Sequence, residues 1–348
     1  MENWKRKLAD SLTDPDNLPS RLIDDREGVR EVVRRYPMRI TPYYLSLIQQ
    51  VGDPIWRQCV PDPQELSDDL CCDPLNETGL SPVPGLIHRY PDRVVWLVSA
   101  ECAVYCRFCM RKGRVGCNHG FACGAKYDKV LAYIAANEAI RDVILSGGDP
   151  LLLDDEILES ILAKLRTIPH LEIIRIGSRV PVTLPERITA RFCRMLKRFQ
   201  PMYVNTHFNH PLEITEASSR ACARLADAGM PLGNQTVLLR GVNDAPGVMK
   251  LLQQRLLSIR VRPYYIHQMD LVRGTGHFRT TVAKGIEIMA GLRGHTSGLA
   301  TPYYVIDLPD GKGKVPILPD TARYQQGKLL LTNYLGEEVV YPEIREDV

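Results

Sequence analysis

The sequence has little net charge, no long apolar run, no internal repeat and no low-complexity segment. Lys and Arg total 44 against 41 Asp and Glu, so the formal net charge is only +3. A charge this small and evenly spread does not suggest a nucleic-acid surface, and small molecules are the better expected partners. No segment approaches the roughly 18 apolar residues of a membrane span, and the N-terminus lacks a signal-peptide core. We therefore expect a cytoplasmic protein that binds neither nucleic acid nor membrane.

Cysteine, in contrast, is plentiful, with ten residues in the chain. The cytoplasm keeps thiols reduced, so a disulfide framework is not expected there. Some of these cysteines are better explained as metal ligands.

Short β-rich runs alternate with helix-like stretches from about residue 90 onward. The runs are VVWLVS at 94–99, VILSGG at 143–148, IIRIGS at 173–178, MYVNTHF at 202–208, NQTVLL at 234–239 and VRPYYIH at 261–267. The clearest helical stretches are 154–168 and 219–229. Near-continuous apolar strands between amphipathic helices are typical of repeated βα units with a parallel sheet. The fold class is therefore α/β, with six strands forming a full or partial barrel.

The regions on either side of this core differ from it. Residues 1–88 combine short helical patterns with Pro-containing breaks, which indicates a helical N-terminal extension. The barrel is expected over 89–299, and 300–348 forms a short C-terminal segment with a strand-like PYYVID. In such a barrel the functional residues lie at the carboxyl ends of the strands. The segments that follow the expected strands are SAECAVYCRFC, SGGDP, GSRVP, THFNHP, LRGVND and HQMD.

Cys102, Cys106 and Cys109 form a C-x3-C-x2-C cluster directly after the first of these strands. Thiolates favour zinc and iron–sulfur clusters. An ordinary electron-carrying 4Fe–4S cluster takes four protein thiolates, so three from one loop would leave one iron open for chemistry. The alternative is a structural zinc site, for which the candidate fourth ligands are Cys117, His119 and Cys123. The remaining cysteines show no ligand spacing and are interpreted as core or surface thiols; they are Cys59, Cys71, Cys72, Cys193 and Cys222.

Several segments, in this order along the chain, together resemble a known family, although no single segment would be specific for it. They are VPGLIHRYPDRVVWLV, CAVYCRFCMRKGRVG, ILSGGDPL, RIGSRVPVTLPERIT, NTHFNHPLEIT, GNQTVLLRGVND, GHFRT, KGIEIMAGLRGHTSG and GKGKVPILP. Over roughly residues 35–345 the sequence resembles the lysine 2,3-aminomutases of the radical S-adenosylmethionine (SAM) superfamily. This resemblance implies a partial (β/α)6 barrel, a 4Fe–4S cluster on the three cysteines, SAM and pyridoxal 5′-phosphate.

The resemblance also implies roles for individual residues. On the SAM side it places Ser146, Gly147, Gly148, Asp149, His207 and Gln235. A Gly-Gly turn after a strand is by itself more often only a turn, and the two polar side chains could equally fill the barrel. By motif match Lys314 is the lysine that holds pyridoxal phosphate, with Lys312 as a competing candidate because the glycine run around it is interrupted. Arg89, Tyr90 and Arg93 surround the phosphate by the same match, whereas HRYPDR alone would indicate a solvated basic loop.

The implied substrate site has one cation and two acids. Arg111 matches the family position that pairs with the substrate carboxylate, and Asp270 and Asp307 match the carboxylates that hold the ε-ammonium of lysine. An Asp at a strand end is more commonly a helix cap. The implied reaction is the isomerisation of L-lysine to β-lysine. A radical from reductively cleaved SAM takes hydrogen from C3, and the amino group migrates from C2 to C3.

Alternatives and departures remain open in the sequence. A related aminomutase could act on arginine or glutamate, and a non-enzymatic zinc or electron-carrier module is the rival class. The sequence ends soon after YPEIRE, so we expect it to lack the cysteine-rich zinc-binding tail of longer lysine aminomutases. This ending and His267, where those enzymes usually carry Tyr, resemble the branch that supplies β-lysine for elongation factor P. Asp307 and the GHFRT and GLRGHTSG segments resemble the free-lysine enzymes instead. Family analogy implies at least a homodimer and an electron donor such as flavodoxin or ferredoxin.

Overall fold

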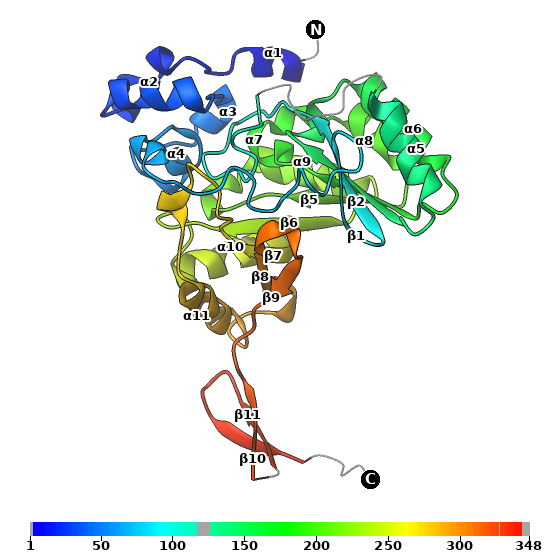
Figure 1. Cartoon of the computed structure of the whole chain (residues 1–348). Helices are drawn as coiled ribbons and strands as arrows, with labels where there is room; N and C mark the ends of the chain where they lie inside the picture. Colours follow the sequence, from blue (N-terminus) through cyan, green and yellow to red (C-terminus); the bar gives the residue numbers. More distant parts are fainter. Residues whose placement is uncertain (1–2, 117–125, 327, 343–348) are drawn as a thin grey trace.

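A computed structural model of the chain describes residues 3–116, 126–326 and 328–342, and a nine-stranded sheet forms its centre (Figure 1). The strands follow one another across the sheet in chain order. They are β1 Leu86–Tyr90, β2 Arg93–Ser99, β3 Asp142–Gly147, β4 Ile173–Gly177, β5 Met202–Thr206, β6 Leu232–Leu238, β7 Arg262–Gln268, β8 Tyr303–Asp307 and β9 Lys314–Pro316. Strands β2 to β8 are parallel, while β1 and β9 are antiparallel edges. The predicted α/β partial barrel is confirmed, with additional strands at both edges.

Helices connect the parallel strands and cover one face of the sheet. They are α5 Lys126–Ala136, α6 Asp155–Arg166, α7 Val180–Thr183, α8 Ala190–Lys197, α9 Glu216–Asp227, α10 Pro246–Ser258 and α11 Val282–Leu292. The helix predicted at 219–229 begins three residues earlier. Thr215 accepts a hydrogen bond from the backbone N–H of Ser218, whose hydroxyl accepts one from Thr215, so a capping box fixes the start.

Burial alternates along the strands and shows which face is the core. In β3, Val143 and Leu145 are fully buried, whereas Ile144 and Ser146 between them are only partly buried. Because side chains alternate across a strand, one face packs on the helices and the other faces a cavity. The sheet is therefore a partial barrel, and the cavity on its inner face is available for ligands.

The N-terminal part contains the helices α1 Asn3–Ala9, α2 Arg26–Arg35, α3 Pro42–Leu45 and α4 Pro54–Cys59, drawn in blue in Figure 1. This part contacts the segments that follow β2 and β4. The Thr41 hydroxyl donates to the backbone oxygen of Thr183, at 2.6 Å, and the backbone oxygen of Gln58 accepts from the N–H of Arg107, at 2.9 Å. The proposed boundary at residue 88 lies within β1, so the extension passes directly into the sheet.

The C-terminal part is divided between two sheets. Strand β8 pairs with β7, so the main sheet continues across the proposed boundary at residue 300. A separate three-stranded sheet, β10 Ala322–Gln325, β11 Lys328–Thr332 and β12 Glu338–Tyr341, projects away from the main sheet in Figure 1. Its outer strands are exposed, and they include the exposed side chains of Tyr324 and Tyr341. Among the described residues, no helix combines the length and apolarity that a membrane crossing requires.

Candidate active site

A cavity of about 860 Å³ occupies the concave face of the sheet, and all nine strands contribute to its lining. It gathers eight of the predicted site residues: Arg89, Tyr90, Arg93, Arg111, Ser146, Gln235, Asp307 and Lys314. The other predicted site residues are not part of this lining: Cys102, Cys106, Cys109, Gly147, Gly148, Asp149, His207 and Asp270. Arg111 and Met110 join the cavity to the cysteine loop, whose last cysteine directly precedes them. The predicted residues therefore form a cysteine end and a lysine end of one site.

The three cysteines of the loop are free thiols that are partly buried. Cys106 Sγ lies 2.8 Å from Nη1 of Arg179, and Cys109 Sγ accepts from the backbone N–H of Arg111, at 3.3 Å. Burial raises the pKa of the Cys102 thiol well above its usual value and that of Cys109 to about 11. Three unpaired thiols with N–H donors aimed at two of the sulfurs fit an iron–sulfur cluster with one open iron.

The alternative of a structural zinc site requires several ligand side chains around one metal ion. No three His, Cys, Asp or Glu side chains among these residues are placed to hold one metal ion. A 4Fe–4S cluster differs in this respect, since each cysteine binds a different iron atom. The candidate fourth zinc ligands Cys117, His119 and Cys123 lie outside the described residues.

A buried ion cluster fixes the cysteine loop to the N-terminal extension. Glu65, in the 3-10 helix η3 Pro63–Leu66, accepts from Nε of Arg107, at 2.8 Å, and lies 2.6 Å from Nζ of Lys112. Burial opposes ionisation of Glu65, but the charges of Arg107 and Lys112 outweigh it and lower the pKa of the carboxyl to about 2. Burial lowers the pKa of Lys112 to about 8. These ionic contacts hold the loop in place without any disulfide.

The SGGDP loop after β3 packs directly against the chain that leads into the cysteine loop. Gly148 has no room for a side chain, because a Cβ there would collide with the backbone of Ala100 and Glu101. Gly147 has a φ of 126°, which favours glycine. The Asp149 carboxylate is buried and accepts from the N–H groups of Leu151, Arg179 and Val180 and from the Ser178 hydroxyl. Asp149 therefore holds this loop against the turn after β4.

His207 and Gln235 occupy different positions. The ring of His207 lies 5.5 Å from the ring of Phe108, a residue of the cysteine loop. Nε2 of His207 is buried without a hydrogen-bond partner among the described residues. Burial and the charge of Arg179 lower the pKa of His207, which keeps it neutral. Gln235, on β6, lines the cavity. An unpaired buried ring nitrogen beside the cysteine loop is a ready contact for a polar ligand.

At the lysine end, Lys314 begins β9 and points into the cavity. Its Nζ lies 2.5 Å from Oδ2 of Asp307 and 3.3 Å from Nδ1 of His267. Its backbone N–H donates to the Tyr90 hydroxyl, at 2.9 Å, and the guanidinium of Arg93 stacks 3.9 Å above the Tyr90 ring. These contacts place the HRYPDR segment against the backbone of Lys314.

The competing Lys312 has a different environment. Its side chain is 71% exposed, its Nζ lies 3.7 Å from Asp310, and it is not part of the cavity lining. Only Lys314 of the two presents its amine to the cavity.

The charges around Lys314 are unequally distributed. Burial alone would raise the pKa of the Asp307 carboxyl, but His267 and Lys314 outweigh it and hold that pKa well below its usual range. Arg89 Nη1 adds a contact to Asp307, at 3.4 Å, while its Nε is buried without a partner among the described residues. Burial and the negative charge of Asp307 raise the pKa of Asp270 to about 7. The unsatisfied guanidinium N–H beside Lys314 fits an anionic group such as a cofactor phosphate.

Arg111 is paired with a residue that the sequence did not single out. Its Nε and Nη2 donate to the carboxylate of Glu77, at 2.9 and 2.6 Å, and its Nη1 lies 3.5 Å from the Ser146 hydroxyl. Glu77 is 4% exposed and also pairs with Arg114, at 3.4 Å. The segment around it, CDPLNETGL, has no motif that marks it as part of a site.

Comparison with known proteins adds independent observations. The radical SAM superfamily model matches residues 96–252, and a lysine-2,3-aminomutase model matches residues 289–348. An L-lysine 2,3-aminomutase of Clostridium subterminale is 53% identical over 92% of this chain and 78% of its own length. One from Acetoanaerobium sticklandii is 50% identical over 98% of this chain and 84% of its own length. A glutamate 2,3-aminomutase of Clostridioides difficile is 47% identical over 92% of this chain and 76% of its own length.

Proposed function

Because the chain belongs to the lysine 2,3-aminomutase family of radical SAM isomerases, we propose that it converts L-lysine to β-lysine with pyridoxal phosphate as a further cofactor. The observation that carries the choice of lysine is Asp307, which lines the cavity and contacts Lys314. Asp270 lies outside this lining, but its pKa responds to the charges of both Asp307 and Lys314. When bound, the cluster with SAM supplies one-electron chemistry, and pyridoxal phosphate supplies the π system through which nitrogen can migrate.

The residues of the cysteine end bind and orient. Cys102, Cys106 and Cys109 hold the cluster and leave one iron open. The SGGDP backbone, fixed by Asp149, packs against the chain that leads into the cysteine loop and would offer polar groups to SAM there. His207 and Gln235 provide further polar contacts on the same side.

The residues of the lysine end hold pyridoxal phosphate. Lys314 is the attachment residue, because its amine reaches the cavity and that of Lys312 does not. Arg89, Tyr90 and Arg93 lie beside it and provide two guanidinium groups and a phenol for the phosphate. The inner face of the sheet holds these groups on β1, β2 and β9, so that cofactor and substrate would be oriented toward each other.

The substrate is bound at its two charged termini. Arg111, oriented by Glu77, pairs with the carboxylate, and Asp307 with Asp270 accepts the ε-ammonium. A site for glutamate would need a cation or an amide in place of these acids. Overall identity does not separate the two substrates, since relatives named for each are 53% and 47% identical to this chain, and so the two acids decide.

Incubation of the reconstituted enzyme with lysine, arginine, glutamate and ornithine under reducing conditions tests this proposal. We expect only lysine to be converted at a substantial rate, with β-lysine as the product. Conversion of glutamate but not lysine would contradict it.

The proposal extends to the cellular setting. Reduction of the cluster requires a one-electron donor, for which a small carrier such as flavodoxin or ferredoxin is suited, and a cytoplasmic location would supply one. The exposed apolar side chains of the β10–β12 sheet favour an assembly of at least two chains.

A further inference from the structure

We propose that Arg179 is a positioning residue that raises the reduction potential of the cluster through its contact with Cys106, and that the N-terminal extension holds it there. The inference rests on the cluster assigned to the cysteine loop under the proposed function. It does not depend on which amino acid is the substrate.

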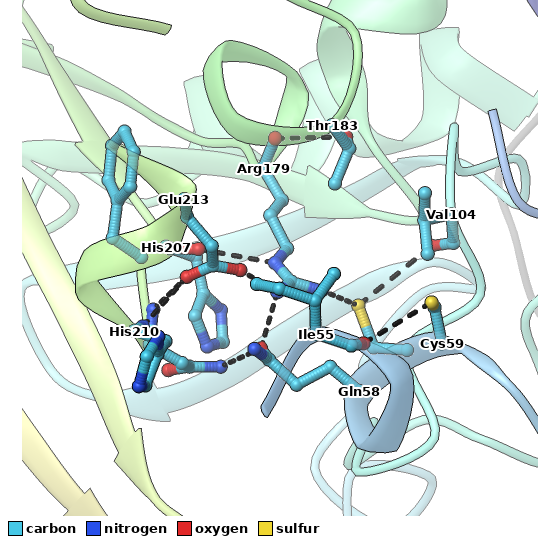
Figure 2. A network of polar contacts seen from close by, with 12 residues as sticks. Ile55, Gln58, Cys59, Val104, Arg179, Thr183, His207, His210 and Glu213 are labelled. Carbon is cyan, nitrogen blue, oxygen red and sulfur yellow. Dashed lines mark hydrogen bonds and ion pairs between the residues drawn. The ribbon is translucent and has the colours of Figure 1, made fainter. Parts of the chain in front are cut away.

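Arg179 follows β4 in the GSRVP segment, and its side chain extends to the cysteine loop (Figure 2). Its side chain is only 8% exposed, and its Nη1 lies 2.8 Å from Cys106 Sγ. The guanidinium also lies over the ring of Phe108, with its central carbon 5.2 Å from the ring centroid. Arg179 is thus a buried cation aimed at one particular cluster ligand.

The rest of the guanidinium is occupied by other partners, so it cannot easily turn away. Nη2 donates to the Tyr44 hydroxyl at 2.9 Å, to Oε1 of Gln58 at 2.6 Å and to Oε1 of Glu213 at 2.6 Å. Nε donates to the backbone oxygen of His207, at 3.2 Å. Tyr44 and Gln58 come from α3 and α4, so two helices of the N-terminal extension fix the arginine that faces the cluster.

Glu213 balances the charge of Arg179 without reaching the sulfur. Its Oε1 accepts from the Tyr44 hydroxyl as well as from Arg179, and its Oε2 accepts from the N–H groups of Asn209 and His210. This carboxylate contacts Nη2 of the guanidinium, whereas Cys106 Sγ contacts Nη1. The positive group therefore stands between the negative carboxylate and the cluster ligand.

This placement has a direct electrochemical consequence. Reduction adds one negative charge to the cluster, and hydrogen bonds to the sulfurs and nearby charge set cluster potentials. A guanidinium N–H donor 2.8 Å from one ligand sulfur stabilises the reduced form more than the oxidised form. Removing the donor lowers the potential and makes the electron harder to deliver.

The test is a redox titration of the anaerobically reconstituted full-length chain, with the reduced cluster followed by electron paramagnetic resonance. In Arg179→Gln we expect the ratio of reduced to oxidised cluster at a fixed potential to fall at least tenfold, or about 59 mV for one electron. Arg179→Lys keeps the charge but loses the planar fork, and should shift the midpoint less, in the same direction. The matched control is Arg187→Lys, since Arg187 is also buried but pairs with Asp155, at 2.7 Å. Its midpoint should equal that of the unmodified chain.

An unchanged midpoint in Arg179→Gln, at full iron and sulfide content, would overturn the inference. If that variant fails to assemble a cluster, Arg179→Lys decides, and an unchanged midpoint there overturns the inference as well. A shifted midpoint supports it even if lysine proves not to be the substrate, so the two proposals fail separately.

Discussion

The two ends of the cavity use buried charge in different ways. At the cysteine end each charged group is locked into a network that a ligand need not disturb, as Arg179 is by Tyr44, Gln58 and Glu213. At the lysine end the groups proposed to bind ligands are paired with each other, most clearly Lys314 with Asp307. The comparison indicates that one end is built to hold a group rigidly, whereas the other must exchange partners on loading.

This exchange gives the lysine end an order of events. Asp307 cannot serve a substrate ammonium while it binds the ammonium of Lys314. Attachment of the cofactor to Lys314 would engage its Nζ elsewhere and so leave the Asp307 carboxylate available. The same carboxylate would then bind first the protein's own lysine and later the substrate's.

The largest expected effect comes from removing the amine of Lys314. Lys314→Ala should abolish stable incorporation of pyridoxal phosphate, because no other lysine amine is seen in the cavity lining of the described residues. Lys312→Ala is the matched control and should load normally. Borohydride reduction followed by peptide mapping measures the outcome, and label on Lys312 in the unmodified chain would contradict it.

The next largest effect concerns Asp307, the carboxylate that changes its partner. Asp307→Asn should weaken lysine binding by about 3 kcal/mol, more than a hundredfold, since a buried charge partner of the substrate is lost. Asp310→Asn, at an exposed site in the turn between β8 and β9, is the control and should have no effect. Dissociation constants for lysine on the cofactor-loaded enzyme provide the measurement. Undiminished affinity in Asp307→Asn would refute the two-acid site.

A smaller effect is expected from Glu77. This residue lines the cavity, but its contact with Arg111 resembles the fixed contacts of the cysteine end. Glu77→Gln should raise the KM for lysine about tenfold, because Arg111 loses the charged bond that orients it. Asp73 pairs with Arg114, at 2.7 Å, outside the cavity lining, so Asp73→Asn is the control. A lower KM in Glu77→Gln would show that Glu77 competes with the substrate instead of orienting Arg111.

The smallest effect is a pH dependence. Burial and Asp307 raise the pKa of Asp270 to about 7, so this carboxyl is mostly neutral below that pH. A cationic substrate favours the ionised form, and the KM for lysine should therefore rise as pH falls below about 7, by at most tenfold per unit. Asp270→Asn should flatten this part of the KM profile. An unaltered profile in the variant would assign the titration to another group.

Local sequence pattern was sufficient for the framework of the site. The apolar runs located β2 to β7 within a few residues at either end, and the spacing of the three cysteines placed them together in the loop after β2. The choice of Lys314 as the cofactor lysine came from the family resemblance and not from local pattern, and it stays a prediction. The structure adds that β9 pairs Lys314 with Asp307 across an antiparallel edge, which no local pattern predicted.

Residues that act through distant partners were not predictable in this way. Arg179 meets Tyr44 across 135 positions of the chain, and Arg111 meets Glu77 across 34. Neither contact leaves a periodic or motif signal, because each partner lies in an irregular segment or a short helix. Such contacts depend on how the N-terminal extension packs on the sheet, and only the folded chain reveals them.

The most direct test of the two-ended site follows deuterium placed at C3 of L-lysine during turnover with SAM. If the cysteine end generates the radical and the lysine end presents C3 to it, deuterium appears on the 5′ carbon of the recovered 5′-deoxyadenosine. Complete retention of the label at C3, or transfer only from lysine labelled at another carbon, would contradict this account.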